Sequence, residues 1–100
     1  MPGNAAAEGK MEFEWDNKKA EANVRKHDVT FQEAASIFGD PLAITFEDPD
    51  HSSNEERYIT FGLSFKQRLI VVSHTERRGR TRIISARPMD SREKKIYEDG

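Results

Sequence analysis

Hydrophobic and polar positions repeat along most of this chain, and the first half of the pattern predicts one strand and two helices. Residues 11–15 (MEFEW) alternate glutamate with apolar residues, as in a short half-buried strand. A helix is predicted from Asn17 to about Lys26, with Asp16 as its N-cap. A second is predicted from Phe31, where apolar residues recur at helical spacing, to Gly39 before Asp40-Pro41.

The later half predicts four strands and a last helix. The strands lie at residues 42–46, 58–62, 69–75 and 81–88, and a polar segment at 47–54 (EDPDHSSN) connects the first two. The continuous apolar run at 69–75 is typical of a central strand covered on both faces. Gly79 in ERRGR predicts a hairpin between the last two strands. Asp90 or Ser91 caps the final helix, with Glu93 as capping-box partner.

This order predicts an α+β fold in a single domain. Strands joined by short turns are expected to be antiparallel, with the two N-terminal helices on one face of the sheet. Val29 to Ala34 gives the strongest local signal for a helix start. Thr30 and Glu33 have capping-box spacing, and Val29 is placed to pack on Ala34.

The last predicted strand, TRIISARP at residues 81–88, carries a guanidinium near each end. Side chains alternate between the two faces of a strand, so Arg82 and Arg87 are expected on opposite faces unless a bulge intervenes.

Composition excludes several classes of protein and site. Residues 1–10 read as a disordered N-terminal tail and residues 11–100 as the domain. No apolar run is long enough for a membrane span, and we expect a cytoplasmic protein. There is no cysteine, and His27, His51 and His74 lack metal-ligand spacing, so neither a metal nor a cofactor is expected.

Charge is divided unevenly along the chain. The formal net charge is -2, but residues 66–95 contain ten basic and three acidic residues. A basic segment of this kind favours a polyanion partner, although charged runs also form ordinary solvated surfaces. The residues predicted to bind RNA are the basic ones around the hairpin and the preceding turn: Lys66, Arg68, Arg77, Arg78 and Arg80.

A cluster of guanidiniums suits phosphodiester chemistry. Each guanidinium presents a fork of donors matched to two phosphate oxygens and stays charged at any relevant pH. When the 2′-OH of RNA attacks the neighbouring phosphate, a base, cationic stabilisation and an acid are enough, without a metal. His74 is a candidate base or acid, and Glu93, Tyr97 and Glu76 are weaker ones.

Each of these residues also has a purely structural explanation. His74 follows an apolar strand and could be a hydrogen-bonded histidine at a sheet edge. Arg82 and Arg87 could pair with Glu55, Glu56 or Glu93, and Glu93 could serve only as a cap. From the residues alone, the prediction is a small α+β domain with a polyanion-binding face.

From Phe13 to Tyr97 the sequence resembles the BrnT family of toxins from type II toxin–antitoxin systems. The similarity rests on FEWD at 13–16 with Lys19, Asn23, KH at 26–27 and VTFQEA at 29–34. It continues in ER at 56–57, Gly62, VV at 71–72, HT at 74–75 and RIISAR at 82–87, with Glu93 and Tyr97.

The resemblance implies a RelE-like fold, a ribonuclease that arrests growth, and neutralisation by a BrnA-like antitoxin that also binds operator DNA. The positions it carries over as catalytic candidates are Arg57, His74, Arg82, Arg87, Glu93 and Tyr97. Two departures are Asp28, where relatives have glycine, and Pro88-Met89, which replace a basic residue and alanine. A non-catalytic module that docks nucleic acid or an acidic peptide is the alternative function.

Overall fold

The structure is a computed structural model that describes residues 11–49 and 56–100. The predicted tail at 1–10 and most of the 47–54 connection, with His51, lie outside the described residues. The elements are β1 (Phe13–Glu14), α2 (Asn17–His27), α3 (Phe31–Ser36), a 3-10 turn η1 (Ile37–Gly39), β2 (Ile44–Glu47), β3 (Arg57–Leu63), β4 (Leu69–Arg77), β5 (Arg80–Pro88) and α4 (Ser91–Asp99). No helix in the described part of the chain has the length and apolar composition needed to cross a membrane.

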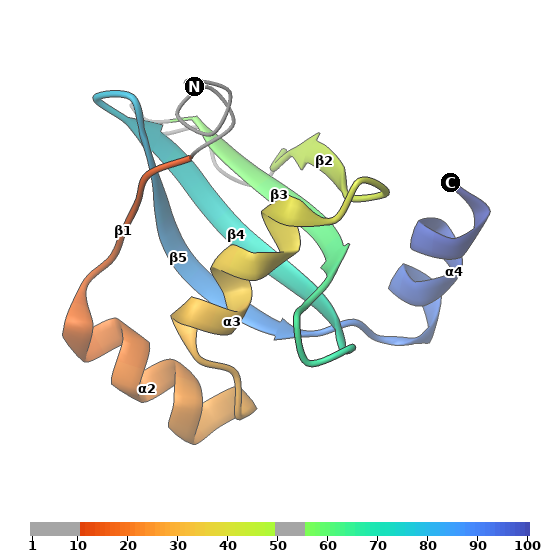
Figure 1. Ribbon diagram of the computed structural model, residues 1–100, viewed down its shortest axis with the longest axis horizontal. Coiled ribbons are helices and arrows are strands. Elements are labelled where there is room, and N and C mark those ends of the chain that lie inside the picture. The colour runs from red at the N-terminus through yellow and green to blue at the C-terminus, as the bar shows by residue number, and fades with distance from the viewer. Residues whose placement is uncertain (1–10, 50–55) are drawn as a thin grey trace, which may run out of the picture.

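The five strands form one sheet in the order β1-β5-β4-β3-β2, with α2 and α3 in front of it in Figure 1. Strands β2 to β5 pair antiparallel, as predicted from their short connections. β1 instead pairs parallel with β5, so the sheet is mixed. The α+β class is confirmed, but the expectation of an antiparallel sheet is wrong at this edge. No hairpin joins β1 to β5, because α2, α3 and strands β2 to β4 lie between them in the chain, so they are free to pair parallel.

The helix starts follow from the caps predicted for them. Asp16 accepts hydrogen bonds from the amides of Lys18 and Lys19, at 2.8 and 3.1 Å, and Asp90 and Glu93 form a complete capping box on α4. α2 ends at Asp28, which adopts φ 58° and ψ 37°. This left-handed conformation explains why glycine suits the position, and aspartate tolerates it at some cost.

The start of α3 departs from the predicted capping box. Thr30 does accept a hydrogen bond from the Glu33 amide at 3.0 Å. The Glu33 side chain does not return to Thr30; it is fully buried and binds Arg68 and Ser64. A tertiary ion pair therefore replaced the local contact that the spacing indicated.

The turn between β4 and β5 is a tight hairpin with two left-handed residues, Arg78 at φ 54° and Gly79 at φ 78°. Arg77 and Arg80 pair across it. Two successive positive φ values are typical of the primed turn whose twist matches that of paired strands. The predicted hairpin is confirmed, and it holds its arginines at one end of the sheet.

Two hydrophobic cores lie on opposite faces of the sheet. The larger packs α3 and η1 against the sheet through Val29, Phe31, Ala34, Ile37, Ile70, Val72, Ile83 and Ala86. The smaller contains Phe61, Val71 and Met89, with Tyr97 of α4 packed against it. Met89, one of the two departures from the family pattern, is thus a core residue. β4 is covered on both faces over its first half, as its apolar run predicted.

A bulge in β5 changes which side chains share a face. Ser73 pairs with Ser85, but His74 pairs with Ile83, which leaves Ile84 as an extra residue. The alternation is reset there, so Ile83 and Ala86 both enter the larger core. Arg82 and Arg87 are thereby placed together on the opposite face.

Candidate functional site

A row of polar side chains crosses four strands on the face opposite α2 and α3. Arg57 of β3 pairs with Thr75 of β4, Thr75 pairs with Arg82 of β5, and Arg82 pairs with Glu14 of β1. Directly paired residues share a face, and neighbouring strands lie about 4.8 Å apart. Arg77 and Arg80 are two positions further towards the turn, and so they are on the same face.

Glu14 is the carboxylate at the centre of this charge cluster. Its Oε2 lies 3.0 Å from an Arg82 terminal nitrogen, and its Oε1 lies 4.0 Å from one of Arg80. The side chains of Glu14 and Arg82 are 25% and 28% exposed, so both still reach solvent. Glu14 also lines a polar cleft whose other walls are Arg77, Arg78 and Arg80.

Sequence reasoning did not select Glu14. The alternation in MEFEW placed it on the solvent side of its strand, which is correct. What was missing is the parallel pairing of residues 13–14 with residues 81–82, which joins segments far apart in the chain. No local spacing pattern carries that information.

Arg87 and Glu93 form a second charged pair further along β5. Two Arg87 nitrogens bind the two Glu93 oxygens at 2.7 and 2.8 Å, and Glu93 also accepts a hydrogen bond from the Asp90 amide at 2.9 Å. The bound Arg87 guanidinium holds the pKa of Glu93 below its ordinary value. This is the pairing that the structural explanation of Arg87 predicted, whereas the partner of Arg82 is Glu14.

The Tyr97 hydroxyl is hydrogen-bonded within the fold and stays protonated. It donates a hydrogen bond of 2.6 Å to Asp40, and this bond raises the Tyr97 pKa to about 12. The phenol therefore keeps its proton at neutral pH, and its ring packs on the smaller core.

His74 lies on the other face of the sheet from Arg57 and Arg82. It is 4% exposed, its Nε2 lies 2.8 Å from the Thr60 hydroxyl, and the Phe38 ring meets it edge-on. Burial lowers the His74 pKa to about 4, so the ring is neutral at neutral pH. The structure does not bring this histidine together with the arginines. It is hydrogen-bonded, as the structural alternative expected, but it lies buried on the internal strand β4 and not at a sheet edge.

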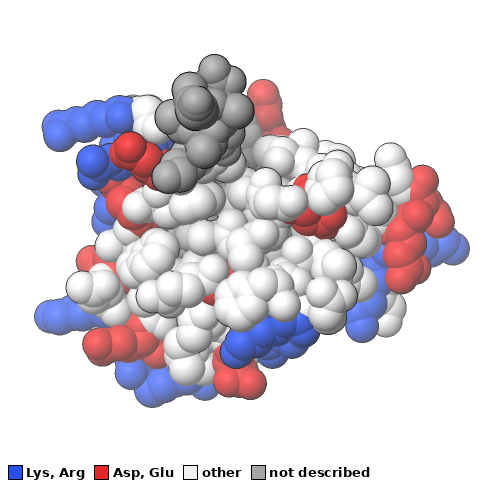
Figure 2. Space-filling view, in the orientation of Figure 1, with Lys and Arg blue, Asp and Glu red and all other residues white. Residues whose placement is uncertain are grey.

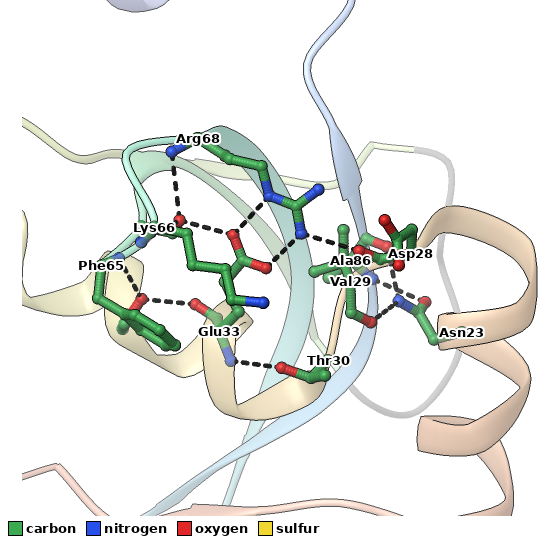
Figure 3. A network of polar contacts seen from close by, with 11 residues as sticks. Asn23, Asp28, Val29, Thr30, Glu33, Phe65, Lys66, Arg68 and Ala86 are labelled. Atoms are coloured by element: carbon green, nitrogen blue, oxygen red, sulfur yellow. Dashed lines mark hydrogen bonds and ion pairs between the residues drawn. The ribbon is translucent and has the colours of Figure 1, made fainter.

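Lys66 and Arg68 sit in the turn between β3 and β4, at the end of β4 opposite the hairpin. β4 has nine residues, and at about 3.3 Å per residue its ends are about 26 Å apart. Arg68 binds buried Glu33 through two nitrogens and donates to the Asp28 carbonyl at 2.8 Å (Figure 3). Arg68 thus ties this turn to the start of α3 and is not part of the hairpin cluster.

Figure 2 shows the side on which α2 and α3 lie. Its middle is mostly uncharged, Lys and Arg lie beside Asp and Glu near the end of the β4–β5 hairpin at upper left, and other charged side chains lie around the periphery. Among the described residues, no three His, Asp or Glu side chains are grouped as metal ligands would be.

Comparison with family models gives a match over residues 15–93 to the ribonuclease toxin BrnT of type II toxin–antitoxin systems. The chain belongs to the BrnT family. Its sequence resemblance to that family is therefore confirmed over most of the domain. A comparison with curated protein sequences finds no match.

The fold agrees with a solved BrnT structure. The chain is similar to the crystal structure of the Brucella abortus ribonuclease toxin BrnT, with a TM-score of 0.62 and 20% sequence identity. The similarity covers 82% of this chain and 100% of the Brucella chain. The two BrnT chains thus share a fold although they share few residues.

The six catalytic candidates taken from the BrnT resemblance lie at three different locations in the fold. Arg57 and Arg82 share the polar row, Arg87, Glu93 and Tyr97 lie towards α4, and His74 lies in the helix-covered core. Gly62 and Asn23 have structural roles. A side chain at Gly62 would place its Cβ 2.8 Å from that of Ile37, and Asn23 bonds both backbone groups of Ala86.

Proposed function

We propose that this BrnT chain is a metal-independent endoribonuclease toxin that acts on cytoplasmic RNA and is neutralised by a BrnA-like antitoxin. The observation that carries the proposal is the polar row, in which Arg57 and Arg82 share one sheet face with the hairpin arginines. The RelE-like architecture and the binding of operator DNA through the antitoxin remain predictions of the family resemblance.

In this proposal, Arg57 and Arg82 stabilise the negative charge that develops on the phosphoryl oxygens during attack by the 2′-OH. A guanidinium in a partly desolvated site is worth more for this purpose than one in water. Arg77, Arg78 and Arg80 would bind neighbouring phosphates of the strand. Arg87 would contact RNA flanking the cleaved bond, with Glu93 and Tyr97 holding that end of the sheet, and His74 would support the fold from the opposite face.

The test is incubation of the purified protein with RNA in the presence of EDTA. We expect fragments that end in 2′,3′-cyclic or 3′-phosphates, with the new 5′ ends carrying hydroxyls. A requirement for added divalent metal, or fragments with 5′-phosphates, would contradict the proposed chemistry.

The antitoxin is tested separately by expressing the native operon. A small second protein that co-purifies with the toxin and restores growth would support neutralisation in a complex. Growth that is unaffected by high-level expression of this chain alone would count against a toxin.

A non-catalytic binding module is the second candidate, and the ion pairs favour it. Arg80, Arg82 and Arg87 each have a carboxylate partner in the fold, so part of their charge is already balanced. Such a module would bind RNA or an acidic peptide in a salt-dependent manner and leave RNA intact after long incubation.

A further inference from the structure

We propose that Glu14 is the general base of RNA cleavage, accepting the proton of the attacking 2′-OH. This inference rests on the proposed ribonuclease function and assigns a residue that the sequence did not select. It follows from where β1 places the Glu14 carboxylate among the hairpin arginines.

The placement of Glu14 meets the geometric needs of a base at a phosphodiester. A base must lie next to the cationic groups that hold the phosphate, because the 2′-OH is on the ribose carbon adjacent to the one that carries the phosphorylated 3′-oxygen. Glu14 is 3.0 Å from Arg82 and 4.0 Å from Arg80, and the cleft it lines has three arginines in its walls. A phosphate bound by these guanidiniums would therefore lie beside this carboxylate.

The backbone of Glu14 is held in place by strand pairing, and its carboxylate remains accessible to solvent. Its backbone is fixed by the parallel pairing with Arg82, and the neighbouring Glu12 carbonyl accepts from the Thr81 amide at 2.8 Å. A quarter of the Glu14 side chain is exposed, so a substrate can reach the carboxylate, while the buried remainder restricts where the side chain can move. A base on a paired strand is more closely positioned than one on a loop.

The other candidate bases are less well placed. His74 is buried on the opposite face, and the Tyr97 phenol is bound to Asp40 with its pKa raised to about 12. Glu93 is also paired with an arginine, Arg87, but it lies in the first turn of α4, whereas Glu14 lines the cleft at the hairpin. None of these three groups lies beside the hairpin arginines.

The step balances without a cofactor. The 2′-oxygen gives its proton to the Glu14 carboxylate and forms a bond to phosphorus. The bond from phosphorus to the 5′-oxygen breaks, and that oxygen takes a proton from water. The products are a 2′,3′-cyclic phosphate and a 5′-hydroxyl, while Arg82 and Arg57 balance the charge on the phosphoryl oxygens.

The experiment compares RNA cleavage and RNA binding in Glu14→Gln and in the unmodified protein. We expect the single-turnover cleavage rate to fall by about 100-fold or more, the range for loss of a general base, with RNA affinity retained or slightly increased. Glu14→Asp should keep partial activity.

Glu12→Gln is the matched control. Glu12 lies on the same segment and is paired with Arg80 at 3.1 Å, but its side chain is 70% exposed and is not among the residues that line the cleft. Its removal should leave the cleavage rate within about threefold. If Glu14→Gln folds poorly, Glu14→Ala with added formate measures the same role, because a small carboxylate should restore cleavage in the vacated space.

The outcomes separate the two proposals. An unmodified protein that cleaves RNA, with Glu14→Gln equally or more active, would overturn the assignment of Glu14 and leave the ribonuclease intact. Failure of formate to restore any cleavage in a folded, RNA-binding Glu14→Ala would also overturn it. An unmodified protein that binds RNA without cleaving it would overturn both.

Discussion

Arg82 and Arg87 project from the same face of β5, although five positions separate them in the sequence. The bulge at Ile84 absorbs one residue, so Arg82 pairs with Thr75 and Arg87 with Val71, which are four positions apart on β4. The two guanidiniums nevertheless have different surroundings. Arg82 meets Glu14 in the polar row, whereas Arg87 is bound by Glu93 at the start of α4.

The two arginines should therefore contribute unequally to RNA cleavage. We expect Arg82→Ala to lower the single-turnover rate by about 100-fold, which is the usual cost of losing one preorganised hydrogen-bond donor to the transition state. Arg87→Ala should cost about tenfold or less, mainly through weaker RNA binding. Arg25→Ala, on the exposed side of α2, is the control and should cleave normally. Equal losses at positions 82 and 87 would argue against a site centred on the hairpin end.

Glu33 should matter for stability because its carboxylate is fully buried and its main partner, Arg68, is partly exposed. Replacing it with glutamine leaves the Arg68 guanidinium without its counter-charge, and we expect a loss of about 2 to 3 kcal/mol, below the range for a wholly buried pair. Urea denaturation measures this. Glu12→Gln, which removes an exposed ion pair, should barely move the midpoint. A similar midpoint for both variants would show that the buried pair contributes nothing.

Protonation of His74 should destabilise the fold under mild acid. Burial lowers the pKa of His74 from 6.5 to about 4, so the unfolded chain binds a proton over a range in which the folded chain does not. The free energy of unfolding is therefore unaffected by His74 above pH 6.5 and falls as the pH drops from 6.5 towards 4. The loss is about 2 kcal/mol at pH 5.

The measurement is the free energy of unfolding between pH 7.5 and pH 5. The decline should be smaller in His74→Gln, and it should persist in His27→Gln, which changes a histidine outside the core. A His74→Gln protein with the full decline would assign the effect to other groups.

Gly62 should not tolerate a side chain. A Cβ at this position would lie 2.8 Å from the Ile37 Cβ and 3.2 Å from the Ile37 carbonyl oxygen, which forces η1 away from the sheet. We expect Gly62→Ala to lose about 1 to 3 kcal/mol through overpacking. Gly39→Ala is the matched control, since nothing lies within 4 Å of its added Cβ. Thermal unfolding of the pair tests this, and equal melting temperatures would contradict it.

The sequence by itself determined the elements and their order. Caps at Asp16, Thr30 and Asp90, the apolar run of β4 and the glycine of the hairpin are local signals, because they depend on residues a few positions apart. The family followed from the same residues and was confirmed. These predictions erred only where a distant partner intervened, as when Arg68 drew the Glu33 side chain away from its own helix end.

Only the tertiary structure decided which charges meet. The parallel pairing of β1 with β5 brings Glu14 to Arg82, across 68 positions of sequence, and the bulge at Ile84 turns Arg87 to the same face. Burial on the opposite face gives His74 a structural environment. Strand register and burial depend on how the whole chain packs, and so neither follows from the spacing of residues along it.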